Sequence, residues 1–241
     1  MKLLCFETSA KTASAAIVSE GRIFAEGSLT TGLTHSQTLM PLCQSLMQSA
    51  GIPLREIDLL AVSTGPGSFT GLRIGISAAK GLAQGSGKRC VGVSTLEALA
   101  CNLMGLETLA CPVMDARCKQ VYTALFRVSG GYPQRLWPDC ALSLEELGEK
   151  LEGFQEPVML TGDGACLAYE ALAAKLPMLR LSPPGLRLQR AASVGFAALA
   201  YLKNGEPVPP GELLPQYLRL PQAERELLKK QQAAQAASME E

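Results

Sequence analysis

The order of strands and helices that the sequence predicts runs through one pattern twice, and this repeat limits the possible folds. In the first part of the chain, three short apolar runs separated by turn residues predict consecutive strands, and a helical spacing of apolar residues follows them. A buried strand and a second helix complete the pattern. The predicted elements are strands at 3–8, 13–19 and 21–29, a helix at 36–50, a strand at 57–63 and a helix at 70–84.

The second part of the chain repeats this order after a linking helix near residues 96–103. Two passes of a three-strand meander followed by alternating helices and strands predict a duplicated α/β fold. The actin, Hsp70 and sugar-kinase (ASKHA) class is built in this way, with two βββαβα-type halves, and the analogy concerns the fold alone. The predicted elements are strands at 109–115, 120–128 and about 135–137, a helix at 144–151, a strand at 158–160, a helix at 167–176, a short strand near 178–181 and a helix at 188–202.

The repeat also suggests how the chain divides. We expect an N-terminal half at residues 1–104, a C-terminal half at 105–221 and a polar tail at 222–241. Residues 204–221 are rich in proline and glycine, which predicts an extended segment that wraps over the surface. The tail has little apolar surface to bury, so we expect it to be poorly ordered.

The charge balance bears on possible partners. Lysine and arginine total 22, and aspartate and glutamate also total 22, so the formal net charge is zero. A protein that binds nucleic acid by itself usually carries a basic excess, because phosphate neutralisation supplies much of the affinity. If this chain serves RNA, we expect it to do so through a partner or a small local patch.

The apolar segments and the cysteines favour a cytoplasmic protein. The apolar run after Met1 is too short for a signal peptide, and no window of about 18 apolar residues could span a membrane. The eight cysteines form no CxxC pair, and the chain has one histidine. We therefore expect reduced, buried thiols, with neither a disulfide framework nor a zinc site.

The glycine-rich stretch from Ser63 to Gly75 lies between a buried strand and a helix. Glycines permit positive φ and close backbone approach, and a helix N-terminus attracts anions, so a phosphate loop is one interpretation. The spacing is GxGxxxG, without the Gly-Lys-Ser/Thr of a Walker loop, and Pro66 removes an amide donor. A tight turn at the start of a closely packed helix is the favoured interpretation.

The helix after this turn has a face of small residues. Two glycines inside a helix cost roughly 1 kcal/mol each relative to alanine, so we expect another backbone to approach closely and offset that cost. Arg73 is the only charge on this helix before Lys80. The residues that share the face are Gly71, Gly75, Ala78, Ala79 and Leu82.

The preceding helix carries no charge, and neither does any residue from Gly27 to Leu54. A surface helix normally carries charge on its outer face, so we interpret this one as covered by the core on one side and by another subunit on the other. A surface helix that happens to be uncharged is the alternative. His35 has no second histidine for a metal motif, and we assign it a structural or interface role beside a serine that could cap the helix. The candidate interface residues here are His35, Ser36, Leu39, Leu42 and Leu46.

Polar residues at the ends of predicted strands mark a possible cleft. Glu7, Thr8 and Ser9 close the first strand, where they could meet a phosphate or form a capped turn. Asp115 and Arg117 end the first strand of the second half, which the repeat places opposite Glu7. Acids that face a cleft suit magnesium and phosphate chemistry, although Arg117 could equally pair with an acid. With Asp163 in its Gly-Asp-Gly turn, these residues show where a relict nucleotide cleft would bind ATP or ADP weakly.

Four segments resemble the TsaB (YeaZ) family in the family's order. The stretch from Thr64 to Gly75 is the most specific, and the others are His35-Ser36, Met114–Arg117 and Pro215–Arg219. The resemblance covers roughly residues 1–221. One departure is Glu7, where the family commonly has aspartate, and this puts any magnesium role of the position in doubt.

The resemblance implies an ASKHA fold and a partner subunit without catalytic activity. TsaB is similar to its catalytic paralogue TsaD, whose metal-binding histidines this chain lacks. It implies pairing with TsaD and the ATPase TsaE during transfer of threonylcarbamoyl to the adenosine beside the tRNA anticodon, and a homodimer when alone. The two N-terminal helices would form the contact in both pairings, and tRNA would be met through the complex. A glycoprotease-like peptidase or an ASKHA small-molecule kinase is the alternative.

Overall fold

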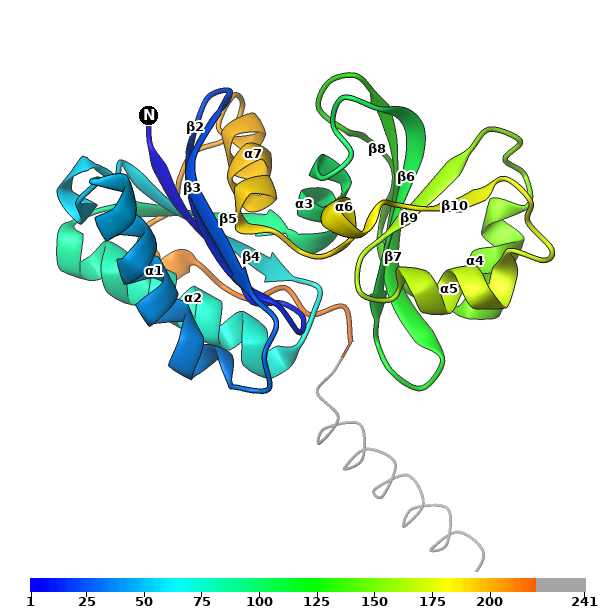
Figure 1. Cartoon of the computed structure of the whole chain (residues 1–241), viewed down its shortest axis with the longest axis horizontal. Coiled ribbons are helices and arrows are strands. Elements are labelled where there is room, and N and C mark those ends of the chain that lie inside the picture. The colour runs from blue at the N-terminus through cyan, green and yellow to red at the C-terminus, as the bar shows by residue number, and fades with distance from the viewer. Residues whose placement is uncertain (220–241) are drawn as a thin grey trace, which may run out of the picture.

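The computed structural model describes residues 1–219, so the tail at 222–241, expected to be poorly ordered, lies outside the described residues. The described chain forms two five-stranded sheets that lie side by side and are flanked by helices (Figure 1). The strand order is β3-β2-β1-β4-β5 in the first sheet and β10-β9-β6-β7-β8 in the second, which is the same order read from the other edge. The predicted duplicated α/β fold is thereby confirmed.

The observed elements follow the predicted order, with the strand β5, the four-residue helix α6 and two short 3-10 turns in addition. The first sheet contains β1 (Leu3–Glu7), β2 (Ala13–Ser19), β3 (Arg22–Leu29), β4 (Leu59–Gly65) and β5 (Arg89–Ser94). The second contains β6 (Glu107–Asp115), β7 (Gln120–Ser129), β8 (Gln134–Ser143), β9 (Val158–Thr161) and β10 (Leu179–Leu181). The helices are α1 (His35–Ala50), α2 (Phe69–Ser86), α3 (Thr95–Cys101), α4 (Leu144–Leu151), α5 (Ala165–Leu172), α6 (Pro184–Arg187) and α7 (Ala191–Tyr201), with short 3-10 turns at Leu54–Glu56 and Pro210–Glu212.

The central strand β1 is buried on both faces of the first sheet. It pairs antiparallel with β2 and parallel with β4, and all of its residues are buried. Leu4 and Phe6 belong to the core that α1 and α2 cover, whereas Leu3 and Cys5 belong to the core that α7 covers. This double burial explains why the strand is a continuous apolar run.

The helix α1 begins and ends at residues suited to helix ends. Its N-cap is Thr34, whose N–H donates to the side chain of Gln37 at 3.3 Å. Ser36, which the sequence suggested as a cap, lies inside the first turn instead. Gly51 follows the helix in the left-handed region with φ 65°, which glycine adopts without steric cost.

The helix α7 lies on the first sheet although it comes from the second half of the sequence. Its buried side chains share a core with β1, β2, β4 and β5. Gly195 permits this approach, because an added Cβ would lie 2.8 Å from Cys5 Sγ. The expected division placed residues 105–221 together in a C-terminal half. The structure differs because α7 is apolar nearly all round and is buried against the other sheet.

The helix α3 lies between the two sheets and contributes to both cores. Leu96 and Leu99 pack with side chains of β6 and β7, while Ala98 and Cys101 pack with the core beneath α7. We call the first sheet with α1, α2 and α7 the first lobe, and the second sheet with α4 and α5 the second lobe. The position of α3 joins the two lobes through apolar contacts.

The last described segment, residues 206–219, follows the first lobe as the predicted extended wrap, and we call it the C-terminal strap. It begins along the edge strand β5, where Val208 and Cys90 exchange backbone hydrogen bonds of 2.8 Å. Its other end reaches the second lobe, where Arg219 Nη1 donates to the carbonyl of Ala116 at 3.2 Å. Within residues 1–219, no helix is long and apolar enough to cross a membrane.

Candidate functional site

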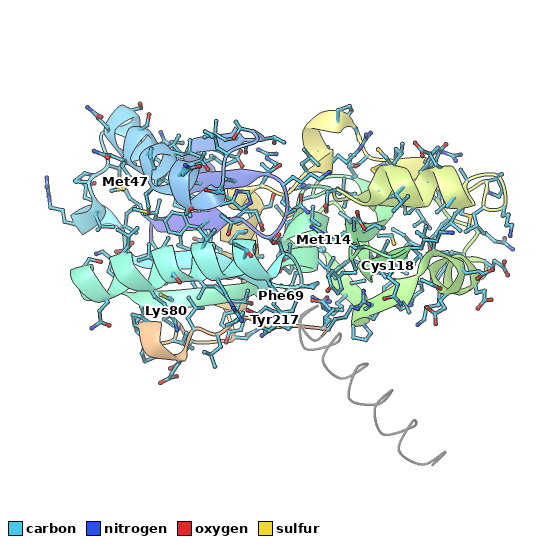
Figure 2. All side chains as sticks on the ribbon, turned by 90° about the horizontal axis from the view of Figure 1, so that it is seen from below. Met47, Phe69, Lys80, Met114, Cys118 and Tyr217 are labelled. Carbon is cyan, nitrogen blue, oxygen red and sulfur yellow. The ribbon has the colours of Figure 1, made fainter. Side chains whose placement is uncertain are left out.

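The helices α1 and α2 lie next to each other over one face of the first sheet (Figures 1 and 2). On α1, Leu39 and Cys43 are buried in the core. Leu42 and Leu46 are partly buried and lie over Gly27 of β3, where an added Cβ would approach Leu42 Cδ1 to 2.8 Å. These apolar residues of α1 therefore hold the helix onto its own sheet.

The glycine face of α2 also turns inward, which corrects the expectation that it meets a partner. Gly71, Gly75 and Ala79 are buried, and an added Cβ at Gly71 or Gly75 would clash with the carbonyl or the hydroxyl of Thr8. The small residues let the helix backbone approach the end of β1. Because Leu39 is buried in the same core, four of the expected interface residues pack within the chain itself.

The outer faces of the two helices are exposed and carry one cation, Arg73 on α2; we call the uncharged exposed residues around it the α1–α2 surface. An added Cβ at Gly81 or Gly85 would meet no atom within 4 Å, so packing inside the protein does not explain these two helix glycines. Ala78 and Leu82, both expected at the interface, are partly buried beside them. The surface consists of Gln37, Met40, Pro41, Gln44, Ser45 and Gln48 on α1 and Thr70, Ser77, Gly81, Gln84 and Gly85 on α2.

The sequence reasoning missed Gly81 and Gly85, although a signal was present. The two residues have the same spacing of four as Gly71 and Gly75 and lie in the same helix. Periodicity identifies glycines that need a close neighbour or lack one, but it does not tell the two cases apart. The structure separates them by what each Cβ would meet.

Three further predicted interface residues have contacts within the chain. His35 Nε2 lies 2.7 Å from the carbonyl of Ala10, which ties the start of α1 to the turn between β1 and β2. Ser36 is exposed, and its hydroxyl lies 3.0 Å from that of Thr34. Arg73 is exposed, but its Nε donates to the hydroxyl of Tyr217 at 2.9 Å. The cation on this helix is thus directed to the C-terminal strap.

The turn after β1 is enclosed by the glycine-rich stretch. Thr8 Oγ1 donates to the carbonyl of Gly71 at 2.8 Å, and the Ser68 N–H donates to the carbonyl of Ser9 at 2.7 Å. An added Cβ at Gly67 would lie 2.6 Å from that same carbonyl of Ser9. The backbone of Thr8 and Ser9 therefore packs against these glycines, as expected for a tight turn that starts a closely packed helix.

Glu7 is buried at the end of β1 with both carboxylate oxygens hydrogen-bonded. Oε1 accepts from the Ser9 N–H at 2.6 Å, and Oε2 accepts from the hydroxyl of Ser63. Burial raises the pKa of Glu7, and the charge of Asp163 adds to this effect, while the hydrogen bonds from Ser63 and Ser9 oppose it. Asp163, from the second lobe, therefore lies near Glu7, and the position of Asp115 opposite Glu7 stays a prediction.

Asp163 and Asp115 are the two acids of the second lobe that were expected at the cleft. Burial raises the pKa of Asp163, and the nearby charge of Asp115 raises it further; Gln189 Nε2 donates to Asp163 Oδ1 at 2.9 Å. Asp115 is exposed, and its Oδ1 accepts from the backbone N–H of Arg117 at 2.7 Å. Asp163 thus lies near enough to Glu7 and to Asp115 for their charges to act on one another, while a cleft around the three acids stays a prediction. No sequence pattern indicated Gln189, which comes from the distant segment before α7.

The hairpin tip beside Asp115 has an unusual backbone. Arg117, Cys118 and Lys119 all lie in the left-handed region, with φ of 62°, 54° and 57°. Figure 2 labels Met114, near the end of β6 and close to the junction of the two lobes, and Cys118, on the turn and farther from the first lobe. Arg117 contacts Asp115 through its backbone N–H, and within residues 1–219 its guanidinium forms no ion pair, so the alternative of a charge pairing is not observed.

Comparison with known proteins assigns a family to this arrangement. The family described as "TsaD: tRNA N6-adenosine threonylcarbamoyltransferase" matches residues 30–226. The "tRNA threonylcarbamoyladenosine biosynthesis protein TsaB" of Bacillus subtilis (strain 168) is 31% identical over 232 residues, which cover 96% of this chain and 100% of that protein. The protein of the same name from Escherichia coli (strain K12) is 36% identical over 129 residues, 53% of this chain and 55% of its own length.

Solved structures agree with this assignment. "YeaZ from Pseudomonas aeruginosa" superposes with a TM-score of 0.76 at 27% identity over 90% of this chain and 99% of its own. A second structure, of "an uncharacterized protein with similarity to peptidase YEAZ" from the same organism, reaches 0.78 at 28% identity, with the same coverage. The fold alone is shared with the activator of the 2-hydroxyisocaproyl-CoA dehydratase from Clostridium difficile, at a TM-score of 0.52 and 10% identity. The chain belongs to the TsaB (YeaZ) family of tRNA threonylcarbamoyladenosine biosynthesis proteins.

Proposed function

We propose that this chain is the non-catalytic partner subunit in threonylcarbamoyladenosine synthesis and that it pairs with a TsaD-like transferase through the α1–α2 surface. The observation that carries the proposal is the scarcity of charge on the outer faces of two adjacent helices, where Arg73 is the one exposed cation, combined with two glycines that nothing inside the protein requires. Small uncharged side chains allow helices of two subunits to approach closely and cost little to remove from water.

The match to the TsaD family supports the same pairing. Because this chain resembles the transferase family over residues 30–226, helices equivalent to α1 and α2 are expected on both partners. Two similar subunits can then meet through equivalent surfaces about an approximate two-fold axis. The same geometry would let two copies of this chain form a homodimer when the transferase is absent.

The test replaces Gly81 and Gly85 with leucine, together, and measures complex formation with the TsaD-like transferase of the same organism by analytical ultracentrifugation. Leucine favours helix and meets open space within the monomer, so the variant should fold, but its added bulk should separate the partner helices and abolish both complex and homodimer. The matched control is Gly185→Leu on α6, another open glycine away from α1 and α2 (Figure 1). A complex that survives the double substitution would overturn the interface.

We also propose that a TsaE-like ATPase joins the pair and that tRNA is bound through the complex. The zero net charge supports the second point, because a chain without a basic excess has little electrostatic affinity for a phosphate backbone. Filter binding of tRNA by this chain, by the transferase and by their mixture compares the contributions directly. Binding of tRNA by the isolated chain as tight as by the mixture would contradict this part of the proposal.

The cleft suits a magnesium nucleotide poorly, so we propose at most weak binding of ATP or ADP there. The activator from Clostridium difficile was solved "with bound ADPNP", but it shares only the fold. In this chain the oxygens of Glu7 are already hydrogen-bonded, and the backbone of Thr8 and Ser9 fills the glycine-rich turn. No group of three or more His, Cys, Asp and Glu within residues 1–219 is placed to hold a metal ion. Neither the hydrogen-bonded oxygens of Glu7 nor the filled glycine-rich turn favours the peptidase or kinase alternative.

A further inference from the structure

The C-terminal strap contacts the first lobe at the end of β4, a few residues before α2. The Gln216 N–H donates to the carbonyl of Thr64 at 2.7 Å, and the Gln216 carbonyl occupies the place that a Cβ at Gly65 would need. The strap therefore contacts the first residues of the glycine-rich stretch. These contacts join residues that are about 150 apart in the sequence, and sequence periodicity does not predict them.

Tyr217, the next residue, contacts the first turn of α2. Its ring stacks on Phe69 with centroids 4.2 Å apart and an angle of 29° between the planes. Its hydroxyl accepts the hydrogen bond from Arg73 Nε at 2.9 Å, and the Arg73 guanidinium lies 5.8 Å from the ring centroid. Figure 2 shows Tyr217 directly beside Phe69. One tyrosine thus contacts both the first residue of α2 and a residue one turn later.

The contact with Arg73 also affects the charge of the partner surface. Arg73 lies on the helix that contributes Thr70, Ser77 and Gly81 to the α1–α2 surface, and an untethered guanidinium could reach across it. Within residues 1–219, Arg73 forms no ion pair with an acidic side chain. Tyr217 is therefore the contact that keeps this cation on the strap side of α2.

We infer that Tyr217 is a positioning residue, which fixes the first turn of α2 and directs Arg73 away from the α1–α2 surface so that the partner meets an ordered and uncharged helix face. The inference rests on the proposed function, because it concerns binding at that surface. It assigns a role to the Pro215–Arg219 motif, which the pairing through α1 and α2 does not by itself explain.

The test compares Tyr217→Leu and Tyr217→Phe in the full-length chain, with Tyr169→Leu on α5 of the second lobe as the matched control. Two quantities are measured: hydrogen exchange of residues 65–75 in the isolated chain, and the Kd for the TsaD-like transferase of the same organism. We expect Tyr217→Leu to accelerate exchange over 65–75 and to raise the Kd about tenfold, the scale of one stacked aromatic contact and its hydrogen bond. Tyr217→Phe keeps the ring and should recover most of the affinity, while Tyr169→Leu should match the wild type in both measurements.

A second substitution separates positioning from simple stabilisation. If the freed Arg73 obstructs the partner, adding Arg73→Met to Tyr217→Leu should restore part of the lost affinity without slowing the exchange of residues 65–75. No such rescue is expected if Tyr217 only stabilises the fold, so its absence would overturn the charge-directing part of the inference.

The remaining outcomes separate this inference from the proposed function. If Tyr217→Leu leaves the Kd unchanged while the wild type binds the transferase, Tyr217 does not position α2 for its partner, whatever the exchange data show. If the wild-type chain itself fails to bind the transferase, the proposed function is overturned, and the inference falls with it. The two failures are distinguished by the wild-type Kd.

Discussion

Glu7 is a carboxylic acid that the fold keeps away from water. It is 1% exposed, and its two oxygens accept hydrogen bonds from Ser9 and Ser63. Burial disfavours the charged form and raises the pKa of the carboxyl group, and the negative charge of Asp163 acts in the same direction. A carboxyl whose pKa is higher in the folded state than in the unfolded state makes stability depend on pH.

The sign of this dependence gives a prediction for Glu7→Gln. Between the unfolded pKa of a glutamate, about 4.3, and the raised folded pKa of Glu7, the folded state binds more protons, so stability falls as pH rises through this window. Glutamine keeps the acceptor for Ser9 but does not titrate. We expect urea-unfolding free energies of the variant to decline less than those of the wild type from about pH 4.5 upward.

Two comparisons check the assignment to Glu7. Because burial also raises the pKa of Asp163, part of the decline should remain in the variant. Glu170→Gln, at an exposed position on α5, is the control and should leave the wild-type decline intact. Parallel curves for the wild type and Glu7→Gln would show that Glu7 is not the group responsible.

At the level of elements, α2 shows two uses of glycine within one helix. Gly75 faces the end of β1, where an added methyl would clash with Thr8 Oγ1, whereas at Gly85 it would meet no atom within 4 Å. Gly75→Ala should therefore lower the free energy of unfolding by about 1–3 kcal/mol through overpacking. Gly85→Ala should raise it by up to about 1 kcal/mol through helix propensity. Urea unfolding at one fixed protein concentration measures both, and equal stabilities would contradict the two-sided interpretation of α2.

The same helix shows how far the sequence could predict the site. The spacing of Gly71 and Gly75 correctly indicated a close backbone approach, but a glycine pattern does not specify whether the neighbour is a strand of the same chain or another subunit. For this reason the face with Gly71 and Gly75 was assigned to a partner, although it packs inside the chain, and the open face with Gly81 and Gly85 was overlooked. The acids were predictable in part. The repeat placed Asp115 opposite Glu7, whereas the charge that acts on Glu7 is that of Asp163, which the sequence placed only in a turn after a strand.

The strand β5 was not predicted, and α7 was predicted in the wrong half of the molecule, each for a physical reason. The strand β5 begins with Arg89 and contains Gly92, so its apolar pattern is too short and too interrupted to stand out. The helix α7 was predicted as a helix near its observed position, but its sequence is apolar almost all round. A helix of this kind is buried wherever it packs, and the sequence does not say which sheet it covers.

At the scale of the whole molecule, the two lobes are interleaved along the sequence. One face of the first sheet is covered by α1 and α2, and the other is covered by α7, which arrives after the second lobe is complete. The helix α3 in turn belongs to cores on both sides. The second lobe, from β6 to β10, is a continuous stretch inserted into the sequence of the first, and the first is closed only when α7 and the C-terminal strap return to it.

This interleaving predicts that residues 1–104 do not form an independent domain. Without α7, the face of the first sheet that includes Leu3, Cys5 and Val18 would be open to water. The free energy lost with this apolar burial is large relative to the free energy of unfolding of a small domain. We expect the isolated fragment to lack near-UV circular dichroism and to unfold in urea without a cooperative transition. Joining residues 188–219 to it through a flexible linker should restore cooperative unfolding, because the linked segment supplies both α7 and the strap. A cooperative transition in the fragment 1–104 alone would show that the first lobe is complete without them.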